Sequence, residues 1–204
     1  SYGPWIRPVS ARPSAEVSEE ERRYENGQDP RILDIIDVPM SAASPALRQT
    51  ENHIIDGKCY WVKKGELDWE EMGKLVDRPE MLWSSGDSTY YGLNDRVKLE
   101  TVANMTNSLL LIQPTSLTIE VQTEGAEFGN PKRRVRASFS YKGVNYSIIV
   151  TDPTAERAFL SKLNGVYQLD NAYLCVSLGE AYSDNYCYKL VTTVIVKEQS
   201  RGFS

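Results

Sequence analysis

The chain has 204 residues, a length that fits one large domain or two small ones and allows a sizeable core. Hydrophobic residues make up 41% and charged residues 25%, values that exclude intrinsic disorder and collagen-like repeats as the main state. The 23 basic and 28 acidic residues give a net charge of −5, so nucleic-acid binding requires a local basic patch. The apolar runs, such as residues 109–112, are too short to span a membrane.

The cysteine content indicates the redox setting. Three cysteines, Cys59, Cys175 and Cys187, are too few and too scattered for a disulfide framework. This pattern favours a reducing, cytoplasmic location. The chain begins with Ser rather than Met, and we expect the native N-terminus to lie upstream.

The first half of the chain predicts short elements. Ser18 and Glu21 form a capping-box pair that starts a helix ending near residue 25. Asp68 caps a second helix that ends before Pro79, and residues 81–107 contain too many turn residues for an assignment. Between the two helices the composition predicts, in order, a strand over 32–38, a loop over 40–49, and strands over 53–55 and 58–63 around an Asp56-Gly57 hairpin turn.

The second half shows clearer periodicity. Asp152 caps a helix with Pro153 at its first position, and Asn164-Gly165 ends that helix. Apolar and polar residues alternate before it, and two further apolar segments follow it. The predicted strands are 117–122, 134–141 and 144–150 before the helix, and 172–178 and 187–196 after it.

This order of elements predicts the fold class. A five-stranded Greek-key barrel with its helix between the third and fourth strands is the OB-fold. We expect a mostly β protein with a few short helices, made of two tandem OB-like Greek-key barrels. The predicted domains are 1–108, an N-terminal OB-like barrel whose first strand is missing, and 109–198, a C-terminal OB-fold, followed by a tail over 199–204. No internal repeat is visible at residue level, so the first barrel is inferred from the pattern of elements alone.

Several phrases along nearly the whole chain resemble one family. They are WIRPVSAR at 5–12, EERRY at 20–24, LDII at 33–36, ENH at 51–53, VTDP at 150–153, CVSLGE at 175–180 and YKLV at 188–191. With them the chain resembles the bacterial dual OB-containing family, whose members usually carry another strand before the first phrase. The resemblance implies nucleic-acid binding and a role in phage defence or conflict between mobile elements, by analogy of fold rather than from a site.

The densest basic cluster is the best functional signal. In the predicted strand 134–141 and its approach, Lys132, Arg134 and Arg136 share the polar face at a spacing of roughly 6.6 Å, near that of phosphates on a single strand. Lys142 extends this face. An OB barrel binds oligonucleotides on the face of its second and third strands. The alternative is an exposed strand kept soluble by cations that pair with acids such as Glu120.

Exposed aromatic rings would add base stacking. The candidates are Tyr90 and Tyr91 in a polar loop and Tyr173 in a later strand, and each also fits an ordinary, partly buried tyrosine. Arg7 and Arg12 form a second basic group suited to bidentate phosphate contacts, or to structural ion pairs with the acids at 19–21.

The enzyme classes have little support. His53 is the only histidine and has no nucleophile motif near it, and no paired Cys or His spacing predicts zinc. No phosphate-binding glycine loop is present, so we predict no cofactor and no catalytic residue. A Mg²⁺-dependent nuclease built on Asp34 with Asp37, or on Asp152 with Glu156, stays open. We expect a non-catalytic module that binds DNA or RNA through the backbone. The alternative is a protein-interaction adaptor or an oligomerisation module for a partner enzyme.

Overall fold

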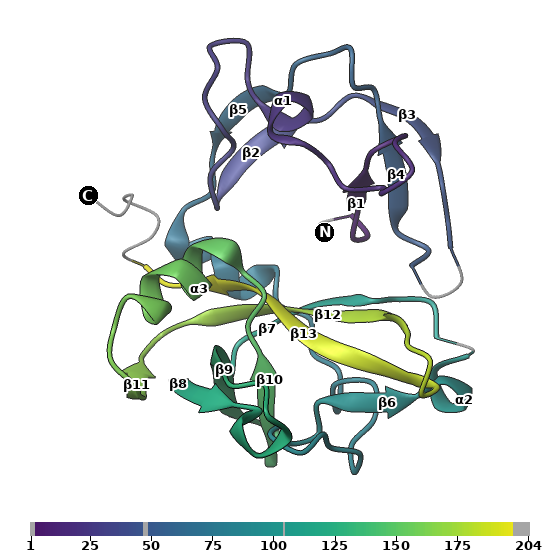
Figure 1. The fold of residues 1–204 in the computed structure, drawn as a ribbon. Coiled ribbons are helices and arrows are strands. Elements are labelled where there is room, and N and C mark those ends of the chain that lie inside the picture. Colours follow the sequence, from purple (N-terminus) through teal and green to yellow (C-terminus); the bar gives the residue numbers. More distant parts are fainter. Residues whose placement is uncertain (1–2, 47–48, 104, 198–204) are drawn as a thin grey trace. The chain divides into compact units, whose positions relative to one another are not determined.

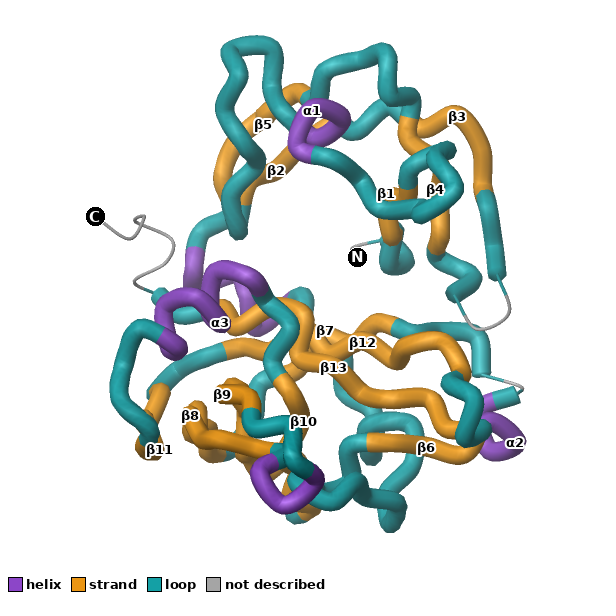
Figure 2. The backbone as a smooth tube through the Cα atoms, viewed as in Figure 1, coloured by secondary structure: helices purple, strands orange, loops and turns teal. Residues whose placement is uncertain are grey.

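The computed structural model describes residues 3–46, 49–103 and 105–197, and the contacts divide the chain into two units. Of the described residues, unit 1 comprises 3–46, 49–75 and 105–108, and unit 2 comprises 76–103 and 109–197. The division places residues 76–103 with 109–197, while the sequence boundary between residues 108 and 109 stays a prediction. In both units strand residues outnumber helical residues and the helices are short (Figure 2), which confirms the predicted mostly β class.

Unit 1 has one sheet of three strands, in the order β1-β4-β3, and one of two, β2-β5. Tyr24, Ile55 and Trp61 form its small core. Its elements are β1 (Arg7–Val9), α1 (Glu19–Arg22), β2 (Asp34–Asp37), β3 (Met40–Ala43), β4 (Asn52–Ile55), β5 (Val62–Glu66) and the 3-10 helix η1 (Trp69–Lys74).

Several predictions for unit 1 were wrong. The Asp56-Gly57 turn does not join a hairpin, because β4 pairs with β1 and β3 while β5 pairs with β2. The predicted loop 40–49 begins with strand β3. The helix after Asp68 is a single 3-10 segment, and the Asp68 side chain makes no capping hydrogen bond.

The capping box of α1 is confirmed and extends into a wider network. Glu21 accepts hydrogen bonds from Ser10 Oγ at 2.7 Å and from Ser18 N at 2.8 Å, and Arg12 lies 3.2 Å away. The hydrogen bond from Ser10 is the main cause that lowers the pKa of Glu21 to about 2, followed by the bond from the Ser18 backbone. The Glu21 carboxylate therefore joins α1 to residues 10–12.

We expect this network to make unit 1 acid-sensitive. A carboxyl whose folded pKa is below its unfolded value of 4.5 adds stability above that pH and loses it as the pH falls toward 2. The difference in urea midpoint between the wild type and Glu21→Gln should therefore shrink steadily between about pH 5 and pH 2. Far-UV circular dichroism measures the midpoints, and a constant difference over this range would contradict the role of Glu21.

The hydrophobic core of unit 2 is larger than that of unit 1. The strands that enclose it are labelled in Figure 1. Alternate residues of the central strands, among them Phe139, Tyr141 and Tyr146, are buried as predicted. The elements are β6 (Arg96–Lys98), α2 (Leu99–Val102), β7 (Leu109–Ile112), β8 (Ser116–Glu124), η2 (Ala126–Phe128), β9 (Lys132–Tyr141), β10 (Val144–Ile149), α3 (Pro153–Leu160), β11 (Gly165–Leu169), β12 (Tyr173–Ala181) and β13 (Tyr186–Ile195).

The strands of unit 2 close into a barrel. β7 and β8 together act as the first strand, since β7 pairs with β12 and β8 with β9 and β11. β9 pairs with β10, and a parallel bridge from Val150 to Val191 joins the end of β10 to β13, which pairs with β12. The α3 helix, capped by Asp152, follows the third strand. This is the predicted OB order, with β9 and β10 as second and third strands and β11 with β12 as the fourth.

Two features lie outside the five-stranded barrel. β6 adds to the edge of β13, and α2 follows it directly. None of the helices in the described part of the chain has the length and apolar character needed to cross a membrane.

Candidate nucleic-acid interface

Lys132 and Arg134 lie on the outer face of β9, as expected. Lys132 is exposed and Arg134 is half-buried, and neither side chain has a hydrogen-bond or ion-pair partner among the described residues. Glu124 lies opposite Lys132 in the strand register, but its carboxylate is bound by Arg136. Two unpaired cations therefore remain on this end of β9.

Arg136 differs from the expectation of an exposed side chain, because it is only 5% exposed. Its Nε and Nη2 donate to the two oxygens of Glu124 at 2.6 and 3.2 Å, and Nη1 lies 3.6 Å from Asp95. Glu120, which faces it in the register, is not its partner. Arg136 is therefore a buried structural cation: its Nη1 has no hydrogen-bond partner, but this atom is buried near Asp95 and does not face a phosphate at the surface.

Lys142 and Tyr173 are also engaged elsewhere. Lys142 forms an ion pair with Glu80 at 2.8 Å and donates to the Arg78 carbonyl. Tyr173 is 6% exposed, so its ring is part of the interior and not a base platform. The polar strand face thus does not extend to Lys142.

Arg7 and Arg12 belong to unit 1, and carboxylates hold both. Arg7 Nη2 donates to Ser108 Oγ at 2.8 Å and lies 3.4 Å from Glu51, whose carboxylate also accepts from Ser108. Arg12 pairs with Glu21. Arg12 thus has the structural role considered for it above, while Arg7 pairs with Glu51 and not with the acids at 19–21.

An exposed aromatic pair lies at the loop that leads into β9, whose first residue is Lys132. Tyr90 is 74% exposed and Phe128 is 66% exposed, and their rings pack edge to face with centroids 5.4 Å apart. Tyr91 supports Tyr90 at 4.9 Å, and its hydroxyl accepts a hydrogen bond from Gly125 N. We call Tyr90, Phe128, Lys132 and Arg134 the platform.

The loop 125–131, between β8 and β9, positions Phe128. Gly125 has φ of 80°, and a Cβ there would lie 2.5 Å from the Asn130 carbonyl oxygen, so glycine is needed at this turn. Sequence reasoning missed Phe128. Its signal was an apolar residue in a polar, glycine-flanked loop at the site where OB barrels bind ligands.

Tyr90 comes from a segment of irregular backbone, residues 84–95, which we call the strap. Leu93 exchanges two backbone hydrogen bonds with Ser147 at the free edge of β10, and Asn94 Nδ2 donates to the Asn145 carbonyl. Asp95 accepts from Thr89 N at 2.7 Å and contacts Arg136. The strap thus occupies part of the strand face that the sequence assigned to ligand.

Lys189 holds the strap near both of its ends. This residue is 1% exposed, and its Nζ donates to the Ser84 and Asn94 carbonyls near the two ends of the strap. Burial lowers the pKa of Lys189 to about 8, against the opposing effects of Asp95 and Asp87. A buried cation with two carbonyl partners holds the strap in one conformation.

The carboxylates considered for a metal have structural roles. Asp34 accepts from Tyr24 and pairs with Lys63, and Asp152 caps α3 and accepts from Val194 N. His53 Nδ1 lies 2.9 Å from the Glu51 carbonyl. Within the described ranges, no group of three or more His, Cys, Asp or Glu side chains is placed to hold a metal ion.

The barrel order is accompanied by a match at the level of sequence. A family model described as the Dual OB-containing domain matches residues 1–194. The chain belongs to the dual OB-containing domain family. No curated protein and no solved structure matches the chain. The dual OB assignment covers both units and gives the tandem OB-like architecture predicted above, and it supports a binding module in general terms.

Proposed function

We propose that the protein binds single-stranded nucleic acid through the platform of unit 2. The observation that carries this proposal is an exposed aromatic pair, Tyr90 and Phe128, next to two cations without partners, Lys132 and Arg134. Stacking on aromatic rings and phosphate contacts to cations are the two elements of sequence-tolerant single-strand binding. A role in bacterial defence is the biological setting that the family suggests.

The charge distribution supports unit 2 as the binding unit. It contains 12 Lys and Arg against 13 Asp and Glu, a net charge of −1, while the described residues of unit 1 contain 9 against 14, a net charge of −5. An almost neutral unit repels a polyanion much less than an acidic one. Because the ring pair is reached from outside, unpaired bases fit it better than bases stacked within a duplex.

Two pairs of substitutions test the platform on the full chain. Tyr90→Ala with Phe128→Ala should weaken binding at least about tenfold, since stacking contributes about 1–3 kcal/mol per base. Lys132→Gln with Arg134→Gln should make the dependence of the logarithm of the binding constant on the logarithm of salt concentration less steep by about 1.4. Each phosphate contact on a single strand contributes about 0.7 to that slope. Fluorescence anisotropy with labelled DNA and RNA strands of about 12 nucleotides, and with a matching duplex, measures both effects.

The matched control changes exposed residues elsewhere in unit 2. Leu163 is 85% exposed, and Lys162 is also exposed with its Nζ over the rings of Phe159 and Tyr167. Leu163→Ala with Lys162→Gln therefore removes an apolar group and a charge that are not part of the platform. This variant should bind as the wild type does. Absence of wild-type binding at low salt, or equal affinity of platform and control variants, would overturn the proposal and favour the protein-interaction adaptor.

A further inference from the structure

A second surface of unit 2 interleaves cations with tyrosines. In the β6–β13 pair, Lys98 lies opposite Tyr186 and Arg96 opposite Tyr188. The residues between them, Val97 and Cys187, are fully buried, which places these four side chains on the outer face. We call Arg96, Lys98, Tyr186 and Tyr188 the ladder. β6 is an added strand, so the ladder lies outside the strand face that an OB barrel ordinarily uses.

The ladder is rigid at its centre. The Arg96 guanidinium lies 4.1 Å from the centroid of the Tyr186 ring, a cation–π contact, and 4.0 Å from Asp184. Asp184 accepts from the Tyr188 hydroxyl at 2.6 Å, and this bond is the main cause that lowers the pKa of Asp184. Asp184 is therefore occupied by ladder residues, and Lys98 remains the exposed cation.

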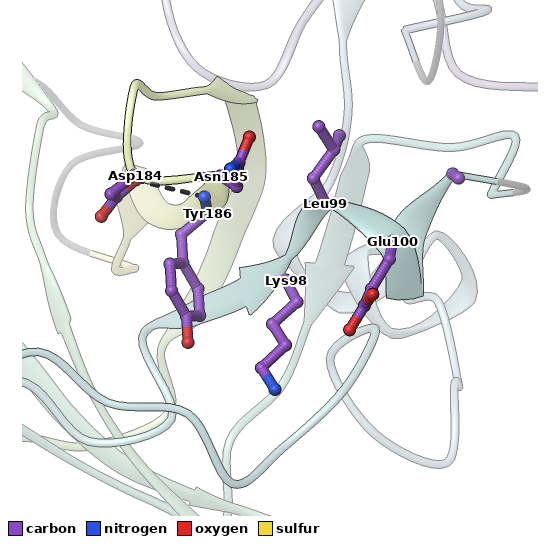
Figure 3. A pocket seen from close by; sticks show the side chains of 7 residues that line it. Lys98, Leu99, Glu100, Asp184, Asn185 and Tyr186 are labelled. Carbon is purple, nitrogen blue, oxygen red and sulfur yellow. Dashed lines mark hydrogen bonds between the residues drawn. The ribbon is translucent and has the colours of Figure 1, made fainter.

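Hollows lie on both sides of the ladder. One, of ≈ 560 Å³, is lined by Lys98, Glu100, Tyr186 and neighbouring residues, and Figure 3 shows Tyr186 and Lys98 projecting to the same side. The other, of ≈ 880 Å³, is lined by Tyr182, Tyr188, Leu190 and the end of β12. The ring of Tyr182 is 70% exposed and packs edge to face on Tyr188 at 5.4 Å. Aromatic rings thus border both hollows.

The strap connects the ladder to the platform. The Tyr186 hydroxyl lies 3.5 Å from Asp87, and Tyr90, three residues further along the strap, packs on Phe128. Three residues span at most about 11 Å. The two aromatic surfaces therefore lie within the length that one OB-fold covers on a strand, about 4–16 nucleotides.

We propose that the ladder continues the platform, so that one single strand of DNA or RNA runs from Phe128 and Tyr90 to Tyr186 and Tyr182. This inference rests on the proposed function. Tyr182 and Tyr186 stack bases and Lys98 contacts a phosphate. The Glu100 carboxylate in the smaller hollow repels phosphate, so a base rather than the backbone enters there.

The test uses oligonucleotide length. Wild-type affinity should rise between strands of about 4 and about 12 nucleotides, because only the longer strand reaches both surfaces. Tyr182→Ala with Lys98→Gln should lose at least about fivefold in affinity for the longer strand, and most of the gain with length. Both side chains are exposed, and equal urea midpoints for this variant and the wild type verify that it folds.

The outcomes separate the two proposals. If Tyr182→Ala with Lys98→Gln binds the longer strand as well as the Leu163→Ala with Lys162→Gln control does, while the platform variant is weakened, the ladder proposal is overturned and the proposed function stands. If the wild type binds no oligonucleotide, both proposals are overturned. Tighter binding of a duplex than of a single strand also overturns the ladder, since paired bases do not reach its rings.

Discussion

Replacement of Arg136 by glutamine is expected to destabilise unit 2 by about 3 to 5 kcal/mol, because it leaves buried carboxylates without their cation. Glu124 and Asp95 are each less than a tenth exposed, and Arg136 is the cation that lies between them. The bidentate bond to Glu124 cannot be replaced by a neutral amide of shorter reach. Urea unfolding followed by far-UV circular dichroism measures the loss as a lower midpoint.

The neighbouring Arg134 provides the control for this prediction. It lies two residues away on the same strand face, is half-buried and has no partner among the residues that the structure describes. Arg134→Gln should therefore change the stability by no more than about 0.5 kcal/mol. Equal midpoints for the two variants would show that the buried ion pairs of Arg136 add nothing to stability.

The contrast between the two arginines also governs how binding data are interpreted. A charge reversal that includes Arg136 would weaken nucleic-acid binding by unfolding the barrel, whatever surface the ligand uses. Only variants of exposed residues such as Lys132 and Tyr90 report on contacts. The sequence could not separate these cases, because a period of two residues shows which face of a strand a side chain occupies but not what covers that face.

Local signals in the sequence predicted local structure well. The Ser18–Glu21 capping box and the Asp152 cap are both formed, since each depends only on residues within one turn. The long strands β8, β9 and β10 follow the predicted alternation closely, because one face of each is buried. Together these elements were sufficient to predict the C-terminal OB-fold.

Features that depend on distant partners were missed. Asp56-Gly57 has the residue types of a hairpin turn, yet β4 pairs in parallel with β1, which lies more than 40 residues earlier in the sequence. The short strand β11 lacks a clear period and is held by β8. Likewise the alternation of Tyr186 and Tyr188 with buried residues is visible in the sequence. Their cationic neighbours, Lys98 and Arg96, come from β6, which lies in a stretch with too many turn residues to assign.

The strap gives the clearest case of such a distant effect. It brings Asp95 to Arg136 across about 40 residues of sequence, and so turns a predicted phosphate contact into a buried ion pair. The same segment places Tyr90 beside Phe128. Intact strap geometry is therefore a requirement of both stability and the platform.

Gly92→Ala should break that geometry and lower the stability of unit 2 by about 2 to 4 kcal/mol, the cost of losing several hydrogen bonds to a buried charge. A Cβ at position 92 would lie 1.7 Å from Asp95 Oδ2. To make room, the Asp95 carboxylate must leave Thr89 and Arg136. The released strap would separate Tyr90 from Phe128, so we expect oligonucleotide affinity to fall together with the urea midpoint.

A double-mutant cycle identifies the cause of this loss. Asp95→Ala alone removes the carboxylate and leaves space for a methyl group at position 92. If the clash with Asp95 is the cause, Gly92→Ala costs little in the Asp95→Ala background, and the coupling free energy is nearly as large as the effect of Gly92→Ala alone. Strictly additive effects would instead mean that Gly92 acts through the strap backbone, independently of the bonds that join Asp95 to Thr89 and Arg136.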